Sequence, residues 1–239
     1  MTLRALARAL LDPFSPEVCA VCGAPGDALC GVCRAALVPV RPPGCGRCGH
    51  PWPEPAPRCR ACLSGLPRAR AGFYYERVAA ALVSAMKDRR RRSLADVLAG
   101  ETAGVLGPPP PGFVLVPVPL SRGRLADRGF DQAHAIADGL AARWDRPLGE
   151  VLTRLGDDPP QRGSPRVRRL ALRAAFRCPG ACPPRCCVVD DVHTTGATLV
   201  AAAGALRAAG ARSVVATTVF RVPAPGTGWF GADAPAGRA

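Results

Sequence analysis

Three things are scarce in this sequence of 239 residues, and each scarcity narrows what the protein can be. Aromatic side chains make up 5% of the residues, whereas proteins that hold single-stranded nucleic acid by base stacking depend on them. No uninterrupted apolar run approaches the ~18 residues that a membrane-spanning helix needs. Lysine occurs once, at Lys87, so arginine carries the excess of positive charge. We therefore expect no membrane span, and we expect any contact with nucleic acid to be made through its phosphates.

The remaining composition is that of a folded protein with a basic surface. Hydrophobic residues make up 48% of the chain, and its length suits one domain of ordinary size plus a small second one. The formal net charge of +14 indicates an anionic partner, either nucleic acid or a phosphorylated metabolite. A basic surface without a localised patch explains the same charge, and composition does not distinguish the two.

The first residues, MTLRALARALLDPFSP, place leucines at helical spacing with arginines between them. They contain no continuous apolar core and no small-residue cleavage site, so they do not match a signal peptide. We predict an amphipathic helix within residues 1–18, docked on the protein itself or, as the alternative, lying on a membrane surface. Without a secretion signal we expect a cytoplasmic protein.

Eight of the twelve cysteines form CxxC pairs in the first quarter of the chain. The pairs are Cys19/Cys22, Cys30/Cys33, Cys45/Cys48 and Cys59/Cys62. Each pair puts two thiolates on a tight turn, and two pairs supply the four sulfur ligands that structural zinc prefers. Disulfides, the other use of paired cysteines, would require an oxidising compartment. The spacing therefore predicts a double zinc ribbon over residues 19–66 that holds two Zn²⁺ ions.

Two pairing orders are compatible with this spacing. We expect the first two pairs to form one site and the last two pairs another, but the pairs can also interleave. Four-sulfur sites leave no open position for a substrate, so we expect structural metals, with neighbouring His50 as a loop residue. The other cysteines lack the spacing and are predicted to bind no metal; they are Cys178, Cys182, Cys186 and Cys187.

From residue 67 onward, apolar runs typical of buried strands alternate with helical patterns. We predict strands in GFVLVPVPL, LGEVLTRL, RCCVVDD and SVVATTVF. We predict two helices from Tyr75 that the arginine run at 89–92 separates, and further helices in FDQAHAIADGLAARW and GATLVAAAGALRAAG. This alternation predicts an α/β domain with a mainly parallel sheet over residues 67–223, followed by a flexible tail at 224–239.

The stretch VVDDVHTTGATL carries the strongest indication of function. We expect Asp190 and Asp191 at the carboxyl end of a buried strand, where parallel sheets bind ligands, and a helix from about Ala197. Adjacent carboxylates repel each other, and hydrogen bonds from ribose hydroxyls or the charge of Mg²⁺ would offset this repulsion. The turn and the helix N-terminus would bind a phosphate. The alternative takes the threonines as helix caps and the aspartates as turn formers.

This stretch resembles the phosphoribosyl pyrophosphate (PRPP) motif of type I phosphoribosyltransferases. The order of segments, from the CxxC pairs through VPVPLSRGRLADRGFDQA and PPQRGSPRVRRLALRAAF to this motif, resembles the ComF family of competence-associated proteins. The resemblance implies a type I phosphoribosyltransferase fold that binds PRPP with Mg²⁺. It implies that Asp190 and Asp191 contact the ribose hydroxyls. It also implies that a turn wraps the 5′-phosphate; the turn residues are Thr194, Thr195, Gly196, Ala197 and Thr198.

An enzyme of this type displaces pyrophosphate from PRPP with a nitrogen nucleophile, and its protein supplies mainly charge and positioning. We expect Arg122 to hold the pyrophosphate, and Arg168 and Arg169 to close over the site. Ser121 and Arg124 belong to the same pyrophosphate turn as Arg122, and Gln161 belongs to the closing segment. Lys87 and Arg128 are second candidates for the pyrophosphate. For each arginine a solvated surface role is the alternative. His193 is expected to be a turn residue without a catalytic role.

Two functions from different classes fit these observations. The first is a phosphoribosyltransferase whose acceptor the sequence does not identify, and the ComF resemblance implies a role in DNA uptake during natural transformation. The second is a non-catalytic module that binds a nucleotide or the phosphates of single-stranded DNA and docks a helicase-like partner through its zinc ribbon.

Overall fold

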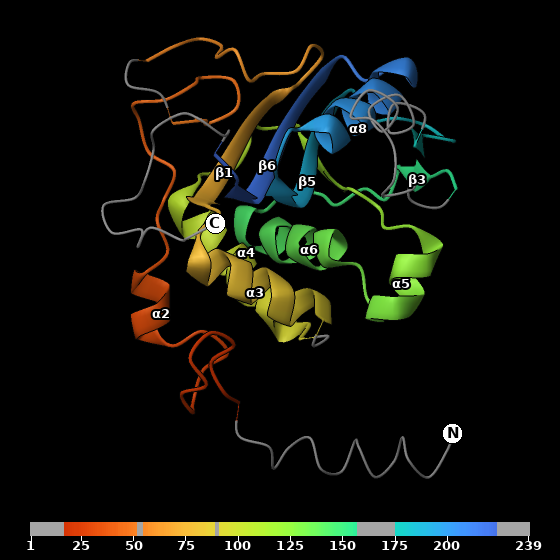
Figure 1. Cartoon of the computed structure of the whole chain (residues 1–239). Helices are drawn as coiled ribbons and strands as arrows, with labels where there is room; N and C mark the ends of the chain where they lie inside the picture. The colour runs from red at the N-terminus through yellow and green to blue at the C-terminus, as the bar shows by residue number, and fades with distance from the viewer. Residues whose placement is uncertain (1–16, 52–54, 89–90, 157–174, 224–239) are drawn as a thin grey trace, which may run out of the picture.

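A four-stranded sheet forms the centre of the computed structural model, which describes residues 17–51, 55–88, 91–156 and 175–223. Its strand order is β1-β6-β5-β2, and every neighbouring pair is parallel (Figure 1). These strands are β1 (Arg68–Tyr74), β2 (Val114–Pro117), β5 (Arg185–His193) and β6 (Ser213–Arg221). A separate antiparallel pair joins β3 (Thr153–Arg154) to β4 (Phe176–Arg177). The predicted α/β class with a mainly parallel sheet is confirmed.

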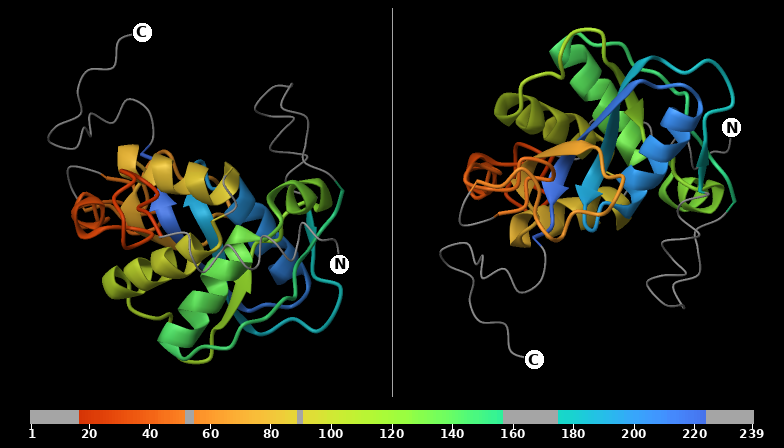
Figure 2. Two further views of the ribbon diagram at one scale, coloured as in Figure 1. Left: turned by 90° about the horizontal axis from the view of Figure 1, so that it is seen from below. Right: turned by 90° about the horizontal axis from the view of Figure 1, so that it is seen from above.

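Helices cover both faces of this sheet, as the two views of Figure 2 show. On one face lie α3 (Arg77–Asp88), α4 (Ser93–Val105) and α6 (Gln132–Trp144), whose buried side chains form one core cluster. On the other face lies α8 (Ala197–Ala208), which belongs to a second cluster. The short α5 (Arg122–Arg128) buries none of its residues.

Strand β5 is central because its residues are apolar on both faces. The four residues 186–189 are fully buried, as expected for a parallel strand that helices cover on each side. On one side β5 pairs with β6 as far as His193, but on the other side β2 ends at Pro117, opposite Val189. The last four residues of β5 therefore extend beyond the end of β2.

The helix α6 follows from its sequence pattern. Its buried residues Ala133, Ile136, Leu140 and Trp144 recur at helical spacing, which gives one apolar stripe. Asp131 caps the N-terminus, because its Oδ1 accepts a hydrogen bond of 3.1 Å from the backbone N–H of His134. The predicted helices around the arginine run, in FDQAHAIADGLAARW and after Gly196 are all confirmed.

One strand prediction needs correction, and one strand was missed. LGEVLTRL was expected to form a full strand, but only Thr153–Arg154 does so, outside the main sheet. Before it, Leu148 forms one isolated parallel bridge with Leu115 of β2. Strand β1 was not predicted, although Arg68, Ala69, Arg70 and Ala71 alternate between polar and apolar residues. That two-residue period is the signal for it.

The cysteine-rich segment packs against both faces of the sheet. Cys19, Leu29 and Cys33 belong to the core cluster of α3 and α4, whereas the cluster of α8 contains Cys48 and Leu66. Between the two parts, the chain runs along the outer edge of β1, where the N–H of Val40 donates to Gly72 and Val38 accepts from Tyr74. This segment covers the exposed edge of β1.

Two of the predicted segments lie largely outside the described residues, namely the N-terminal helix at 1–18 and the tail at 224–239. The domain boundaries at 66 and 223 stay predictions. Within the described part of the chain, none of the helices has the length and apolar character required to cross a membrane.

Candidate functional site

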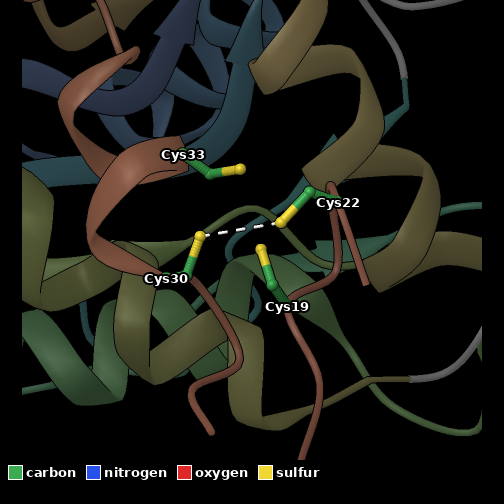
Figure 3. A group of neighbouring side chains, drawn as sticks. All are labelled: Cys19, Cys22, Cys30 and Cys33. Carbon is green, nitrogen blue, oxygen red and sulfur yellow. Dashed lines mark hydrogen bonds between the residues drawn. The ribbon is translucent and has the colours of Figure 1, made fainter. Parts of the chain in front are cut away.

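The eight cysteines of the CxxC pairs gather into two groups of four. One group comprises Cys19, Cys22, Cys30 and Cys33 (Figure 3), and the other comprises Cys45, Cys48, Cys59 and Cys62. Within each group the sulfur atoms lie within 4.8 Å of one another. This grouping is the sequential pairing that we expected, so the interleaved order is wrong.

The spacing of the sulfur atoms fits tetrahedral zinc. A Zn–S bond of ~2.3 Å places two tetrahedral ligands about 3.8 Å apart. The Sγ atoms of Cys22 and Cys30 are separated by 3.7 Å, and those of Cys48 and Cys59 also by 3.7 Å. His50 belongs to neither group; its imidazole is buried, and its carbonyl accepts from the N–H of Cys45.

Both groups need a cation because burial opposes a cluster of thiolates. Burial, reinforced by the neighbouring cysteines, raises the pKa of Cys33 to about 12. Burial also acts to raise the pKa of Cys45, but backbone N–H groups of the knuckle outweigh it and lower that pKa to about 7. Backbone N–H groups thus favour the thiolate of Cys45 in the second group, whereas burial disfavours that of Cys33 in the first, and a bound metal would supply the missing charge.

The two groups differ in exposure. All four cysteines of the second group are buried, whereas in the first group Cys22 is exposed and Cys30 is half-buried. Solvent and small molecules therefore have direct access to the first group only.

The paired aspartates lie at the end of β5 that extends beyond β2. The prediction placed them at the end of the strand, but the strand continues to His193 because β6 still runs beside it. Burial and the neighbouring Asp191 hold the pKa of Asp190 well above its usual range. The Nζ of Lys87, near the end of α3, lies 2.8 Å from Oδ2 of Asp191. Lys87, one of the two second candidates for the pyrophosphate, thus contacts one aspartate of the pair.

A turn connects β5 to α8 immediately after the aspartates. Thr194 and Thr195 are exposed, and α8 begins at Ala197 as predicted. Gly196 has a φ of +84°, and a Cβ there would lie 2.7 Å from Leu66 and 2.8 Å from His193, so only glycine fits. Within the described residues, the N–H groups of Thr194 and Thr195 donate no hydrogen bond to the protein. They are free to bind an anion.

The loop after β2 reaches the same edge of the sheet. The N–H of Val118 donates to the carbonyl of Val189, one residue before the aspartates. Ser121 is buried and caps α5, with its Oγ accepting from the N–H of Arg124. Arg122 is the first residue of α5 and is exposed. Arg128, in contrast, donates from Nη1 to Oε1 of Gln132, 2.9 Å away.

Three predicted residues, Gln161, Arg168 and Arg169, lie outside the described part of the chain. Thr198 lies in the first turn of α8. His193 is buried at the end of β5, and burial together with the charge of Arg221 lowers its pKa to about 3. The expectation that His193 is not catalytic stays a prediction.

The four remaining cysteines lie at the start of β5 and before it, away from the aspartates. Cys186 and Cys187 are fully buried in the strand, and the Sγ of Cys186 donates to the carbonyl of Pro183, 3.2 Å away. The Sγ of Cys182 lies 3.5 Å from the carbonyl of Leu206 in α8.

Arg221, the last residue of β6, was missed by the sequence reasoning. Its side chain is 3% exposed and lies between the second cysteine group and the turn. Its Nε donates to the carbonyl of Cys48 (3.1 Å), and its Nη1 donates to the carbonyl of Thr194 (2.8 Å). An arginine at the end of a strongly apolar strand was the available signal, because such a position is buried and a buried guanidinium needs partners.

Comparison with known proteins supports this description. A family model of the double zinc ribbon domain matches residues 10–63. Competence protein ComFC of Bacillus subtilis (strain 168) is 40% identical over 112 residues, which cover 46% of this chain and 45% of the relative. The chain thus spans about half the length of the curated relative that it matches. This chain therefore carries an N-terminal double zinc ribbon, with two groups of four sulfur atoms at zinc spacing, and over 112 residues it is similar to the competence protein ComFC.

Proposed function

We propose that this protein binds PRPP together with Mg²⁺ at the carboxyl edge of the sheet and acts in DNA uptake. The paired carboxylates of Asp190 and Asp191 would bind the ribose hydroxyls. The turn from Thr194 to Thr198 would bind the 5′-phosphate through its free N–H groups and the positive end of α8. The role in DNA uptake rests on the similarity to a protein named for competence.

The observation that carries this proposal is the excess of negative charge on Asp190 and Asp191, next to the turn. Two adjacent carboxylates face one ammonium group, that of Lys87, and burial makes the ionised form of Asp190 costly. A fold tolerates such a pair where a ligand supplies the missing partners. Anion-binding N–H groups in the next residues make that ligand a phosphorylated one, and ribose hydroxyls satisfy carboxylates.

The same residues define how a transfer reaction would be supported. Asp190 and Asp191 would hold the Mg²⁺ of the PRPP complex, and the ion neutralises pyrophosphate charge when it is bound. Lys87 lies within the site and would exchange its contact with Asp191 for one with a phosphate oxygen. Arg122, at the start of α5 on the same edge, would hold the pyrophosphate as it leaves.

Calorimetric titration of the full chain with PRPP and MgCl₂ tests the proposal. The wild type should bind PRPP, and Asp190→Asn combined with Asp191→Asn should abolish binding. Asp138→Asn, an exposed position of α6, is the matched control and should bind like the wild type. Equal affinities for all three proteins would refute the site. Release of pyrophosphate with nucleobases, ammonia or DNA as acceptors then tests for turnover.

A second function is favoured by α5. This helix buries none of its residues and contains Arg122, Arg124 and Arg128, which suits binding to the phosphates of single-stranded DNA without catalysis. Fluorescence anisotropy with labelled oligonucleotides should then give a sequence-independent affinity that falls steeply with salt. An affinity that is unchanged when α5 loses Arg122 and Arg124 would rule out this helix as the contact.

A further inference from the structure

We propose that Arg221 is a positioning residue that connects the second zinc site, the group containing Cys48, to the phosphate turn, residues 194–198. Through Arg221 this zinc site holds the turn in the conformation that binds phosphate. The inference rests on the proposed function, because it concerns how the turn that would bind the 5′-phosphate of PRPP is held in place. It concerns the second site alone, since the first site packs against α3 and α4.

Arg221 joins two parts of the molecule that are distant in the sequence. On one side, its Nε donates to the carbonyl of Cys48 (3.1 Å), and its Nη2 lies 3.9 Å from the Sγ of the same cysteine. On the other side, its Nη1 donates to the carbonyls of His193 (3.1 Å) and Thr194 (2.8 Å), and it also contacts the carbonyl of Val222. One buried guanidinium thus bonds a zinc ligand and the beginning of the turn.

These bonds fix the direction of the free N–H groups. In a trans peptide, the C=O and N–H groups point in opposite directions. The carbonyls of His193 and Thr194 point inward to Arg221, so the N–H groups of Thr194 and Thr195, which share those peptides, point the other way. Both residues are exposed, and a phosphate would meet these groups from that side.

The charge of the zinc site explains why an arginine can be buried there. Within the described residues, Arg221 forms no ion pair with a carboxylate; its partners are carbonyl oxygens and the sulfur of Cys48. An uncompensated buried charge is costly. Four thiolates around one Zn²⁺ carry a net charge of about −2, which provides the compensation. The geometry therefore links a filled second site to a fixed turn.

Arg146 offers a matched control. Like Arg221 it donates to several carbonyls, those of Pro109, Trp144 and Asp145, and it is partly buried. It lies after α6, near the beginning of β2, and it contacts neither the cysteine groups nor the turn. A general effect of losing a carbonyl-binding arginine should appear in Arg146→Met as well.

The test uses the full chain and three variants, namely Arg221→Met, Arg221→Lys and Arg146→Met. We expect Arg221→Met to retain two zinc ions per chain but to lose at least tenfold in PRPP affinity. Arg221→Lys should be intermediate, because one ammonium keeps the charge but cannot span both sets of carbonyls. Arg146→Met should bind like the wild type. An Arg221→Met protein that contains two zinc ions and binds PRPP within twofold of the wild type would overturn the inference.

Hydrogen exchange in the absence of ligand separates this inference from the proposed function. The N–H of Val222 donates to His193, and that of Val200 donates to Gly196, so both report on the ends of the turn. Their exchange should accelerate in Arg221→Met, while that of Leu115, bonded to Pro147, stays unchanged. If the wild type binds no PRPP, the proposed function fails, but the coupling still stands or falls on this exchange pattern.

Cadmium NMR provides a readout that needs no Arg221 variant. In the chain loaded with ¹¹³Cd, the resonance that disappears in Cys22→Ser belongs to the first site, which identifies the other resonance as the second. Adding PRPP should shift the second resonance and leave the first in place. A shift of the first resonance alone, or of neither when PRPP binds, would refute the coupling. This result holds even where Arg221→Met does not fold.

Discussion

Lys87 and Asp191 form an ion pair of 2.8 Å between the last turn of α3 and the end of β5, and both side chains are largely buried. Lys87 is the only lysine of the chain. The same ammonium group acts to lower the pKa of Asp190, but burial and the charge of Asp191 outweigh it, so the pKa of Asp190 is raised. The charge of one ammonium group thus acts on two carboxylates.

Replacing Lys87 by methionine should therefore affect both stability and binding. Because the pair is partly shielded from water, we expect a loss of about 1–2 kcal/mol in the free energy of unfolding. PRPP affinity should fall as well, since the variant lacks a cation for the phosphates. Urea unfolding and calorimetry measure the two effects. The control is Arg207→Met, which likewise replaces a basic side chain by methionine, but in α8, where Arg207 donates to the carbonyl of Gly65. Unchanged stability in Lys87→Met would show that the ion pair contributes nothing to stability.

Asp190→Asn should stabilise the protein and, at the same time, weaken the proposed binding of PRPP. The variant eliminates a carboxylate whose ionised form is disfavoured by burial and by Asp191, so we expect a gain of about 1 kcal/mol, or 2–4 °C in Tm. Differential scanning calorimetry without ligand measures it. A decrease in Tm would show that Asp190 is satisfied within the protein, which would remove the main support for a ligand there.

The pH dependence of stability follows from the same carboxyl. The pKa of Asp190 is raised in the folded state, so the folded protein binds this proton more tightly than the unfolded chain does. The stability that this bound proton contributes is fully present below about pH 4, the pKa of an aspartate in the unfolded chain, and it is lost as the pH rises through the pKa of Asp190 in the folded protein. The difference in Tm between Asp190→Asn and the wild type should therefore grow with pH in this window. A difference that is constant from pH 4 to 8 would contradict the assignment.

The position of the turn between β5 and α8 could be predicted because its signal is local. Strand, turn and helix follow one another from Arg185 to Ala208, and the helix begins at the predicted Ala197. The strand was predicted to end too early, because its length depends on β6, a partner elsewhere in the chain. The CxxC spacing likewise gave both cysteine groups, although only the fold excludes the interleaved order.

Long-range contacts could not be predicted in this way. Lys87 was a second candidate and Arg221 was missed, because Lys87 reaches Asp191 from α3 and Arg221 reaches the turn from β6. The position of Arg221 at the end of an apolar strand indicates that it is buried, but nothing in the sequence identifies its partners, the second cysteine group and the turn. Arg128, the other second candidate, stays a prediction; its contact with Gln132 lies within the same part of the chain.

Zinc should leave the two sites at different rates. Cys22 of the first site is exposed, whereas the second site is buried throughout and bonded to Arg221. Titration with a chelator should release one zinc ion quickly, and the second only as the protein unfolds. A colorimetric zinc assay run beside circular dichroism follows both events. Simultaneous release of two ions would show that the sites are equally accessible, and a total of one ion would contradict the double ribbon.

Gly196 provides the sharpest test of the turn itself. Gly196→Ala would force a side chain into a φ of +84° and bring its Cβ to 2.7 Å from Leu66, beside the imidazole of His193. We expect a loss of about 2–3 kcal/mol in stability, together with weaker PRPP binding, because the turn must shift to relieve the contact. Gly204→Ala is the matched control in α8, where an added Cβ meets nothing within 4 Å. It should be neutral or stabilise the protein by up to ~1 kcal/mol, since alanine favours a helix. If both variants unfold at the wild-type urea concentration, the turn has room to relax, and glycine at 196 is not what keeps the N–H groups of Thr194 and Thr195 facing outward.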